Sequence, residues 1–268
     1  MPRIAVGIEY DGSAFAGWQS QPSLRTVQQT LEDALGAVAA QPVSLVAAGR
    51  TDAGVHARAQ VAHFDTAAER TPRGWLLGAN SELPADVALQ WVQPVPQHFH
   101  ARYSAAARVY RYLILNRTAR SALQAARAAW VTRTLDTQAM AAAAAELIGE
   151  HDFSAFRAAE CQAKSPIRRL TSLTVARRGD WIVIEAVANA FLHHMVRNLA
   201  GLLIAVGKGE APAEWAAQVL AGRDRTRAAA TAPAAGLYLA HVRYPGVFAL
   251  PEPPQLPPTA DRLSSPGH

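Results

Sequence analysis

Residues 49–64 read GRTDAGVHARAQVAHF and join a glycine-bearing loop to a predicted strand. The two glycines let the loop backbone take positive φ or approach another group closely. We predict a strand at residues 60–64, after the loop, and another at residues 43–48, before it. The loop is thereby placed between the second and third strands of a larger unit.

The elements around this loop complete a first unit. Residues 3–9 alternate between apolar and other side chains, which predicts a half-buried strand. Thr26 and Gln29 form a capping-box pattern at the start of an amphipathic helix. Thr71 and Pro72 open a second helix, and residues 87–92 form the closing strand. The predicted order is β-α-β-β-α-β.

The second half repeats this order. It is predicted to contain strands at 109–115, 170–175, 181–187 and 237–243, helices at 136–148, 191–206 and 213–220, and an irregular segment at 149–166. Tandem β-α-β-β-α-β units predict an α+β protein of two ferredoxin-like halves, with a cleft between lobes 1–105 and 106–248. The Pro- and Ser-rich residues 249–268 are expected to be a disordered tail.

The composition restricts the class of protein. Half of the residues are hydrophobic and 18% are charged, which suits a large core and not a disordered chain. The formal charge of +5 fits a polyanionic partner. Cys161 is the only cysteine, so disulfide scaffolds and cysteine-rich zinc sites are excluded. No long apolar stretch is present, and we expect a cytoplasmic protein with no membrane partner.

Three ionisable groups, Arg50, Asp52 and His56, lie within a span of seven residues in the loop at 49–56. One interpretation is a tight turn in which Asp52 hydrogen-bonds to its own backbone. Against this, no second acid lies nearby in the sequence for a paired-carboxylate or metal site. A single carboxylate beside an arginine suits a reaction that needs one ionised nucleophile or base.

The helix at 191–206 is apolar around most of its circumference, and Arg197 and His194 share the remainder. A buried guanidinium is costly unless it is paired. Arg197 therefore either reaches solvent or any nearby acid, or pairs with Asp52 across the cleft and keeps that carboxylate ionised. His193 and His194 point in different directions, so packing or RNA contact is favoured over metal binding.

Residues 100–120, HARYSAAARVYRYLILNRTAR, interleave arginines with tyrosines. Alternation along the strand puts Tyr110 and Tyr112 on one face and Arg111 on the other. Arginines bind phosphates, and aromatic rings stack on unpaired bases. The alternative is that the tyrosines belong to the core and the arginines to a solvated face.

Six stretches together resemble the tRNA pseudouridine synthase A family, in the family's order and up to about residue 245. They are YDGSAFAGWQSQP at 10, TVQQTLEDAL at 26, GRTDAGVHARAQVAHF at 49, ARYSAAARVYRYLILN at 101, FLHHMVRNLAGLLIAVGKG at 191 and TAPAAGLYL at 231. The resemblance implies the pseudouridine synthase fold, in which two ferredoxin-like halves form a central antiparallel sheet with helices outside. It also implies a homodimer that acts without cofactor or metal on uridines 38, 39 and 40 of the tRNA anticodon stem-loop.

The resemblance also assigns roles to single residues. Asp52 looks like the catalytic nucleophile, Tyr110 like the tyrosine that packs on the target base, and Arg197 like the active-site arginine. Arg50 looks like the residue that holds the flipped-out conformation. Candidate RNA contacts are Arg58, Arg108, Arg111 and His194.

Isomerisation of uridine requires the base to detach at N1, turn and reattach through C5, after the nucleotide has been flipped out of its helix. Asp52 could attack the sugar C1′, attack C6 of the base, or act on a sugar proton, and the sequence leaves all three open. Two other classes compete with this reading. One is a noncatalytic RNA-binding protein with tandem RRM-like halves, and the other is an acid–base hydrolase that uses Asp52 and His56.

Overall fold

The computed structural model describes residues 1–252, which fall into two compact units. Unit 1 contains Met1–Ala107 and the segment that starts at Tyr238, and unit 2 is Arg108–Leu237. The disordered tail predicted from residue 249 lies, beyond residue 252, outside the described residues. Residues 1–252 contain no helix with the length and hydrophobicity of a membrane span.

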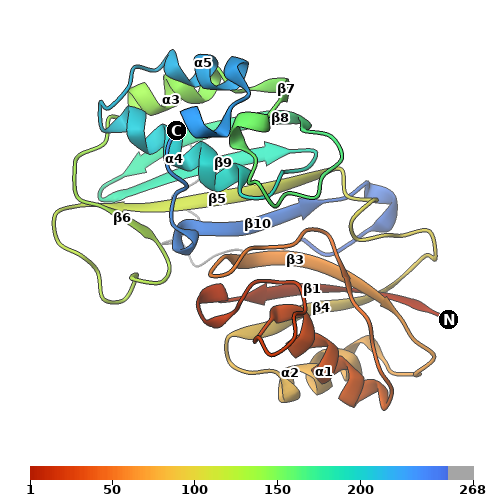
Figure 1. Ribbon diagram of the computed structural model, residues 1–268. Coiled ribbons are helices and arrows are strands. Elements are labelled where there is room, and N and C mark those ends of the chain that lie inside the picture. The colour runs from red at the N-terminus through yellow and green to blue at the C-terminus, as the bar shows by residue number, and fades with distance from the viewer. Residues whose placement is uncertain (253–268) are drawn as a thin grey trace. The chain divides into compact units, whose positions relative to one another are not determined.

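Unit 1 is built around the central strand β1 (Arg3–Tyr10) (Figure 1). It pairs antiparallel with β4 (Val87–Val95) on one side and with β3 (His56–Asp65) on the other. The short β2 (Val46–Ala47) pairs antiparallel with the far end of β3. This gives the order β4-β1-β3-β2 of a ferredoxin-like sheet. The start of β3 also pairs in parallel with β10 (Leu237–Arg243).

The prediction that β1 is only half buried is wrong. Ile4 to Ile8 are all buried, because the face without large side chains is also covered. A Cβ atom at Gly7 would lie 2.0 Å from Nε1 of Trp91 on β4, so the indole occupies the space above the glycine. The face of β1 that carries Ala5 and Gly7 is therefore buried, and not exposed to solvent.

The two helices of unit 1 lie against each other on one side of its strands (Figure 1). Helix α2 (Pro72–Glu82) begins at Pro72 as predicted, and the Thr71 hydroxyl caps it by accepting a hydrogen bond from the Gly74 amide. In α1 (Val27–Ala39) the predicted capping box is absent. The hydroxyl of Thr26 is buried and, in the described part of the chain, has no hydrogen-bond partner.

Unit 2 contains the strand order β5-β9-β8-β7, with each neighbouring pair antiparallel. Its strands are β5 (Ala107–Asn116), β6 (Ala129–Val131), β7 (Gly149–Asp152), β8 (Ile167–Arg178) and β9 (Trp181–Ala188). The predicted hairpin is confirmed as β8 and β9. The short strands β6 and β7 were not predicted, and β7 lies in the segment that was expected to be irregular.

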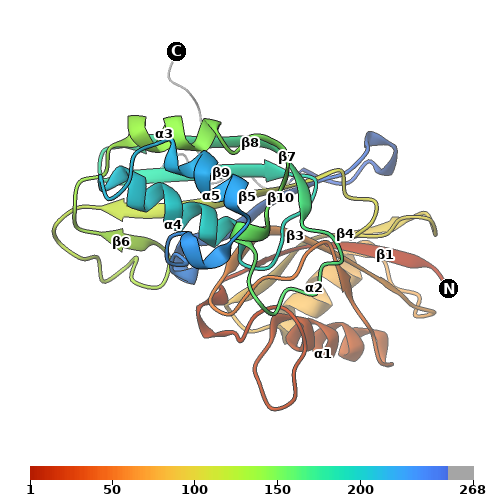
Figure 2. The same ribbon diagram turned by 45° about the horizontal axis from the view of Figure 1, so that its top comes forward.

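Three helices cover one face of the unit 2 strands (Figure 2): α3 (Thr137–Ala145), α4 (Met195–Gly207) and α5 (Trp215–Gly222). The Asp136 side chain caps α3 by accepting from two backbone amides. Helix α4 begins four residues later than predicted because His194, with φ of 61°, takes a left-handed conformation. Single 3-10 turns lie at Gly12–Ala14, Ser154–Phe156, Arg225–Arg227, Ala234–Gly236 and Gly246–Phe248.

The α+β class is confirmed, and the first half has the predicted β-α-β-β-α-β order. The second half has the same order with β6, β7 and α5 added to it. Strand β10 closes the second repeat in sequence but groups with unit 1 through its pairing with β3. The single shared sheet, the cleft between lobes and the lobe bounds at 105 and 106 stay predictions.

Candidate functional site

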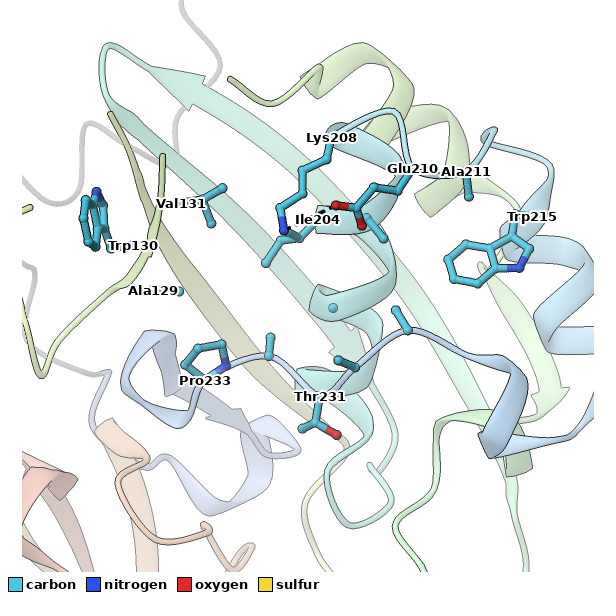
Figure 3. A pocket seen from close by; sticks show the side chains of 15 residues that line it. Ala129, Trp130, Val131, Ile204, Lys208, Glu210, Ala211, Trp215, Thr231 and Pro233 are labelled. Carbon is cyan, nitrogen blue, oxygen red and sulfur yellow. Dashed lines mark ion pairs between the residues drawn. The ribbon is translucent and has the colours of Figure 1, made fainter. Parts of the chain in front are cut away.

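A pocket of about 630 Å³ lies within unit 2, between β6, α4, α5 and the segment 229–233. Figure 3 shows Trp130 and Trp215 at opposite sides of it, with the ion-paired Lys208 and Glu210 between them. Within residues 1–252, its lining includes none of the site residues predicted from the sequence. The candidate site therefore has to be built from the loops that carry those residues.

Asp52 lies in unit 1, in the loop between β2 and β3, and is partly exposed. The residues around it are firmly held. The Thr51 hydroxyl shares a 2.7 Å hydrogen bond with the Tyr10 hydroxyl, and the Thr51 carbonyl accepts from the Trp18 amide at 3.0 Å. The Val55 amide donates to the Asp52 carbonyl at 3.1 Å and closes a turn. The loop thus presents a carboxylate from a fixed backbone.

Two glycines in residues 12–18 allow that segment to approach the Asp52 loop closely. A Cβ atom at Gly12 would lie 2.0 Å from the Val55 carbonyl oxygen. Gly17 has φ of +100°, and a Cβ atom there would lie 2.8 Å from the Thr51 carbonyl oxygen. The Gly54 amide also donates to the Phe15 carbonyl. Residues 12–18 therefore brace the Asp52 loop through backbone contacts.

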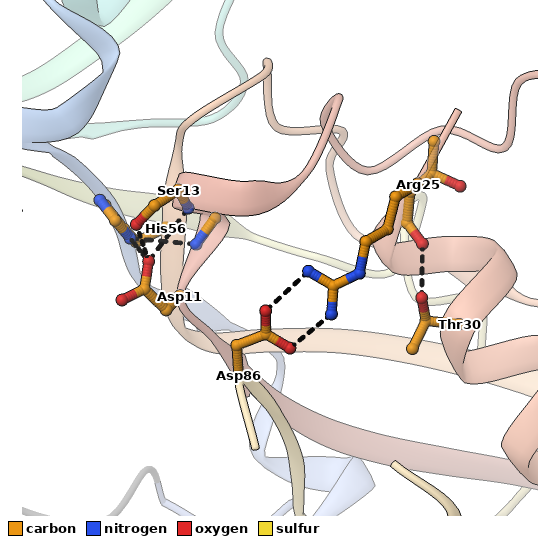
Figure 4. Close-up of polar contacts among 8 residues, drawn as sticks. Asp11, Ser13, Arg25, Thr30, His56 and Asp86 are labelled. Atoms are coloured by element: carbon orange, nitrogen blue, oxygen red, sulfur yellow. Dashed lines mark hydrogen bonds and ion pairs between the residues drawn. The ribbon is translucent and has the colours of Figure 1, made fainter. Parts of the chain in front are cut away.

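His56 has a structural role in this brace (Figure 4). It is 2% exposed, its ring stacks on Tyr238 at 4.6 Å, and Nδ1 accepts from the Gly12 amide at 3.1 Å. The Asp11 carboxylate lies 3.2 Å from the same nitrogen and also accepts from the Ser13 amide. These contacts fix the imidazole within the fold and disfavour the hydrolase in which His56 serves as an acid–base group.

Figure 4 also shows an ion pair that supports residues 12–18. Arg25 forms two 2.8 Å hydrogen bonds with the Asp86 carboxylate, and its guanidinium carbon lies 4.0 Å from the centre of the Phe15 ring. The Phe15 carbonyl accepts from the Gly54 amide, so Phe15 links this ion pair to the Asp52 loop, with its ring on Arg25 and its backbone on Gly54. Arg50 lies exposed beside Asp52. Arg58 follows on β3, where its charge adds to burial in lowering the pKa of His241.

In unit 2, β5 alternates as predicted. Tyr110 and Tyr112 are buried on one face, and Tyr110 meets Phe191 edge-on at 5.1 Å. Arg111 points to the other face, where its Nε donates to Glu185 across the strand pair at 2.7 Å. Arg108 is almost fully buried and donates to the Asn189 carbonyl at 2.7 Å. Arg108 and Arg111 thus both have partners inside the unit.

Arg197 lies in the first turn of α4, three residues after His194. Its Nε donates to the Ala232 carbonyl at 2.9 Å, and the Ala232 amide donates to the Arg197 carbonyl at 3.1 Å. His194 stacks on the exposed His193 at 4.1 Å. Asp52 belongs to unit 1 and Arg197 to unit 2, so their pairing stays a prediction.

Comparison with known proteins decides the family. The family described as tRNA pseudouridine synthase matches residues 7–104 and 143–245, well over half of the chain. The chain belongs to the tRNA pseudouridine synthase family. Relatives named tRNA pseudouridine synthase A include proteins from Nitrosococcus oceani (59% identical over 249 residues), Burkholderia ambifaria (56% over 254) and Thiobacillus denitrificans (54% over 252). These alignments cover 93%, 95% and 94% of this chain and 96%, 94% and 97% of the relatives.

The family match contains the Asp52 loop and the start of α4, but not the stretch between its two ranges, which holds Tyr110. The relatives align over more than nine-tenths of the chain. The sequence resemblance to the pseudouridine synthase family is confirmed as a whole. The roles of single residues stay proposals.

The synthase chain also contains a polar network that was not predicted. Asn198, 1% exposed, donates to the Phe156 carbonyl at 2.8 Å and accepts from the Thr231 hydroxyl at 2.7 Å. Arg225 donates to Asn198, to Thr231 and to the Ala229 carbonyl. This network ties residues 229–231 to α4 beside Arg197. The signal in the sequence was an asparagine next to Arg197 in a helix whose other residues are apolar.

The neighbouring contacts extend this support. A Cβ atom at Gly201 would lie 2.0 Å from the Ala230 carbonyl oxygen, so α4 touches the segment directly. The Tyr112 hydroxyl donates to the Pro233 carbonyl at 2.8 Å. Burial raises the pKa of Tyr112, and the positive charge of Arg197 partly offsets that rise. In this pseudouridine synthase, β5 and α4 therefore both hold the strap formed by residues 229–233.

Proposed function

We propose that this chain isomerises uridine to pseudouridine at positions 38, 39 and 40 of the tRNA anticodon stem-loop, with Asp52 as nucleophile. Family membership carries the reaction itself, the formation of pseudouridine in tRNA. The observation that supports Asp52 is its setting: a partly exposed carboxylate on a loop whose neighbours on both sides are fixed by backbone contacts. A preorganised group of this kind avoids the cost of ordering at the moment of reaction.

The reaction is balanced without any group from outside. The N1–C1′ bond of uridine breaks, a C5–C1′ bond forms, the C5 proton leaves to solvent, and N1 gains a proton. Product and substrate have the same mass. Asp52 attacks C1′, attacks C6, or removes a sugar proton, and each route needs a carboxylate that is ionised when the base has been flipped out.

Three further residues are assigned to substrate binding. Tyr110 packs on the target base, and stacking of this kind is worth roughly 1–3 kcal/mol per base. Arg197 serves as the active-site arginine, and its Nε contact with the Ala232 carbonyl fixes the plane of the guanidinium. Arg50, exposed next to Asp52, holds the flipped-out nucleotide.

Four residues are assigned to the rest of the tRNA: Arg58, Arg108, Arg111 and His194. For Arg111 and Arg108 the intramolecular contacts with Glu185 and Asn189 compete with phosphate binding. A homodimer in the cytoplasm, requiring neither metal nor cofactor, completes the proposal. Sedimentation of the chain with and without tRNA tests the dimer.

Release of tritium from tRNA labelled at C5 of uridine tests the reaction and Asp52 together. We expect wild type to release tritium and Asp52→Asn to release none, while both bind tRNA with similar Kd. Asp33→Asn, at an exposed carboxylate on α1, is the matched control and keeps full activity. Full turnover by Asp52→Asn would overturn the assignment. Binding without tritium release in wild type would favour the noncatalytic RNA-binding protein instead.

A further inference from the structure

An exposed aromatic side chain in unit 1 is held in an ordered loop outside the proposed catalytic residues. Tyr103 is 76% exposed, yet the loop that carries it is closed at both ends. The Ser104 amide donates to the His100 carbonyl at 2.8 Å, and the His100 amide donates to the Ser104 hydroxyl at 3.0 Å. The amides of Arg102 and Tyr103 both donate to Nδ1 of His100, at 3.1 and 3.2 Å.

Buried side chains of unit 1 hold this loop in place. The Ala101 amide donates to Nδ1 of His63, which is 3% exposed, at 3.1 Å. The His100 ring meets that of His63 at 4.9 Å, and the Ala101 carbonyl accepts from the Tyr244 hydroxyl at 2.6 Å. Phe99, at the start of the loop, is fully buried. The backbone beneath Tyr103 is therefore fixed by the core of unit 1.

The ring of Tyr103 has two neighbours of its own. His100 packs on it with ring centres 4.3 Å apart and planes at 35°, and the guanidinium carbon of Arg102 lies 5.6 Å from its centre. The charged groups that act on His100 are Arg3 and Arg102, both positive. Arg3 is ion-paired with Asp65, and Arg102 is an exposed side chain next to Tyr103 in the same loop. An ordered, exposed aromatic ring beside an arginine is an arrangement that binds unpaired bases next to phosphates.

We propose that Tyr103 and Arg102 form a stacking platform for an unpaired base of the substrate tRNA, separate from the residues that perform the chemistry. Tyr103 supplies the ring on which the base stacks, and Arg102 supplies the charge for the adjacent phosphate. The loop fixes the ring before the RNA arrives, so little conformational freedom is lost on binding. This inference rests on the proposed function for the identity of the RNA, and not for the contact itself.

The test compares Tyr103→Ala with Tyr103→Phe in fluorescence-anisotropy titrations of labelled substrate tRNA. The loss of one base stack weakens binding by about 5- to 100-fold, so Kd and KM rise in Tyr103→Ala while kcat at saturating tRNA stays within about twofold. Tyr103→Phe keeps the stack and binds like wild type. Leu77→Ala, at a side chain 54% exposed on α2 of the same unit, is the matched control and leaves Kd unchanged.

Competition with single-stranded and fully paired RNA oligonucleotides sharpens the result. We expect Tyr103→Ala to lose affinity for the single-stranded competitor and to keep its affinity for the paired one. Unchanged Kd and KM in Tyr103→Ala would overturn the proposal. So would a lower sedimenting mass with unchanged tRNA affinity, because that result would assign the ring to contact between copies of the chain. The Kd titrations and the competition experiment need no turnover, so failure of the catalytic assignment to Asp52 would be seen separately.

Discussion

Replacing Gly12 by alanine perturbs the Asp52 loop without touching a charged group. The φ of Gly12 lies outside the left-handed region, so the backbone itself tolerates alanine, and the requirement for glycine is one of space. The new Cβ would lie 2.0 Å from the Val55 carbonyl oxygen, whereas ordinary contacts begin near 3.4 Å. The two segments would have to separate by about 1.4 Å. Because the contact is with backbone, no side-chain rotation relieves it.

The displacement acts on both stability and catalysis. Overpacking of this kind costs about 1–3 kcal/mol in the free energy of unfolding. Val55 closes the turn with the Asp52 carbonyl, so a shift of Val55 carries the carboxylate with it. A misplacement of about 1 Å at a catalytic group can lower the rate by about 100-fold. We therefore expect kcat for tritium release to fall about 100-fold, with the Kd for tRNA changed far less.

Urea unfolding and single-turnover tritium release measure the two effects on the same preparations. Gly222→Ala is the matched control: no atom lies within 4 Å of its added Cβ, and alanine is favoured at this end of α5. It should keep full activity and be as stable as wild type, or slightly more so. If Gly12→Ala were folded and released tritium at the wild-type rate, the argument that residues 12–18 position Asp52 would be refuted.

Further predictions concern the buried polar groups. Asn198→Ala removes the buried hydrogen-bond partner of the Phe156 carbonyl and the Thr231 hydroxyl. It should lower the free energy of unfolding, measured in urea, by about 2–4 kcal/mol. A decrease below about 0.5 kcal/mol would contradict a stabilising role for the network. Tyr112→Phe removes the donor to the Pro233 carbonyl and should cost about 1–3 kcal/mol, measured against the exposed Tyr103→Phe, which should cost nothing. His63 is buried, and burial lowers its pKa to about 4. Between pH 6.5 and 4 the unfolded chain therefore binds a proton that the folded chain does not. The free energy of unfolding should fall as the pH drops through that window, by at most roughly 3 kcal/mol. The slope of unfolding free energy against pH should flatten in His63→Gln, and an unchanged slope would assign the effect to other groups.

The sequence predicted those elements whose local signals agree with their surroundings. The Thr71-Pro72 helix start and the hairpin at residues 178–181 carry turn or capping chemistry that needs no distant partner. The strand predicted at 43–48 is observed only as Val46–Ala47, the two residues in register with His63 and Ala62 of β3. Strands β6 and β7 are short and defined by their neighbours, so periodicity could not find them.

The same division holds for the site. The Asp52 loop was found from its residue types and from family resemblance, both of which are properties of the sequence. The partner of Gly12 was not, because the contact joins residues more than forty positions apart and leaves no local pattern. Arg197 was identified as costly to bury, but its acceptor, the Ala232 carbonyl, is a backbone group that no side-chain pattern encodes.

The proposed nucleophile, Asp52, and the proposed substrate-binding arginine, Arg197, are supported in the same way. In unit 1 the loop of Asp52 is held by backbone contacts from residues 12–18, and in unit 2 Arg197 exchanges hydrogen bonds with the backbone of Ala232. Each unit thus orients its own group with contacts that lie entirely inside that unit. Substitutions that disturb either support should therefore lower kcat more than they raise KM, because they misplace a reacting group and leave the RNA-binding surface intact. Equal effects on the two constants for Gly12→Ala and Asn198→Ala would mean that these residues serve tRNA binding and not the orientation of the reacting groups.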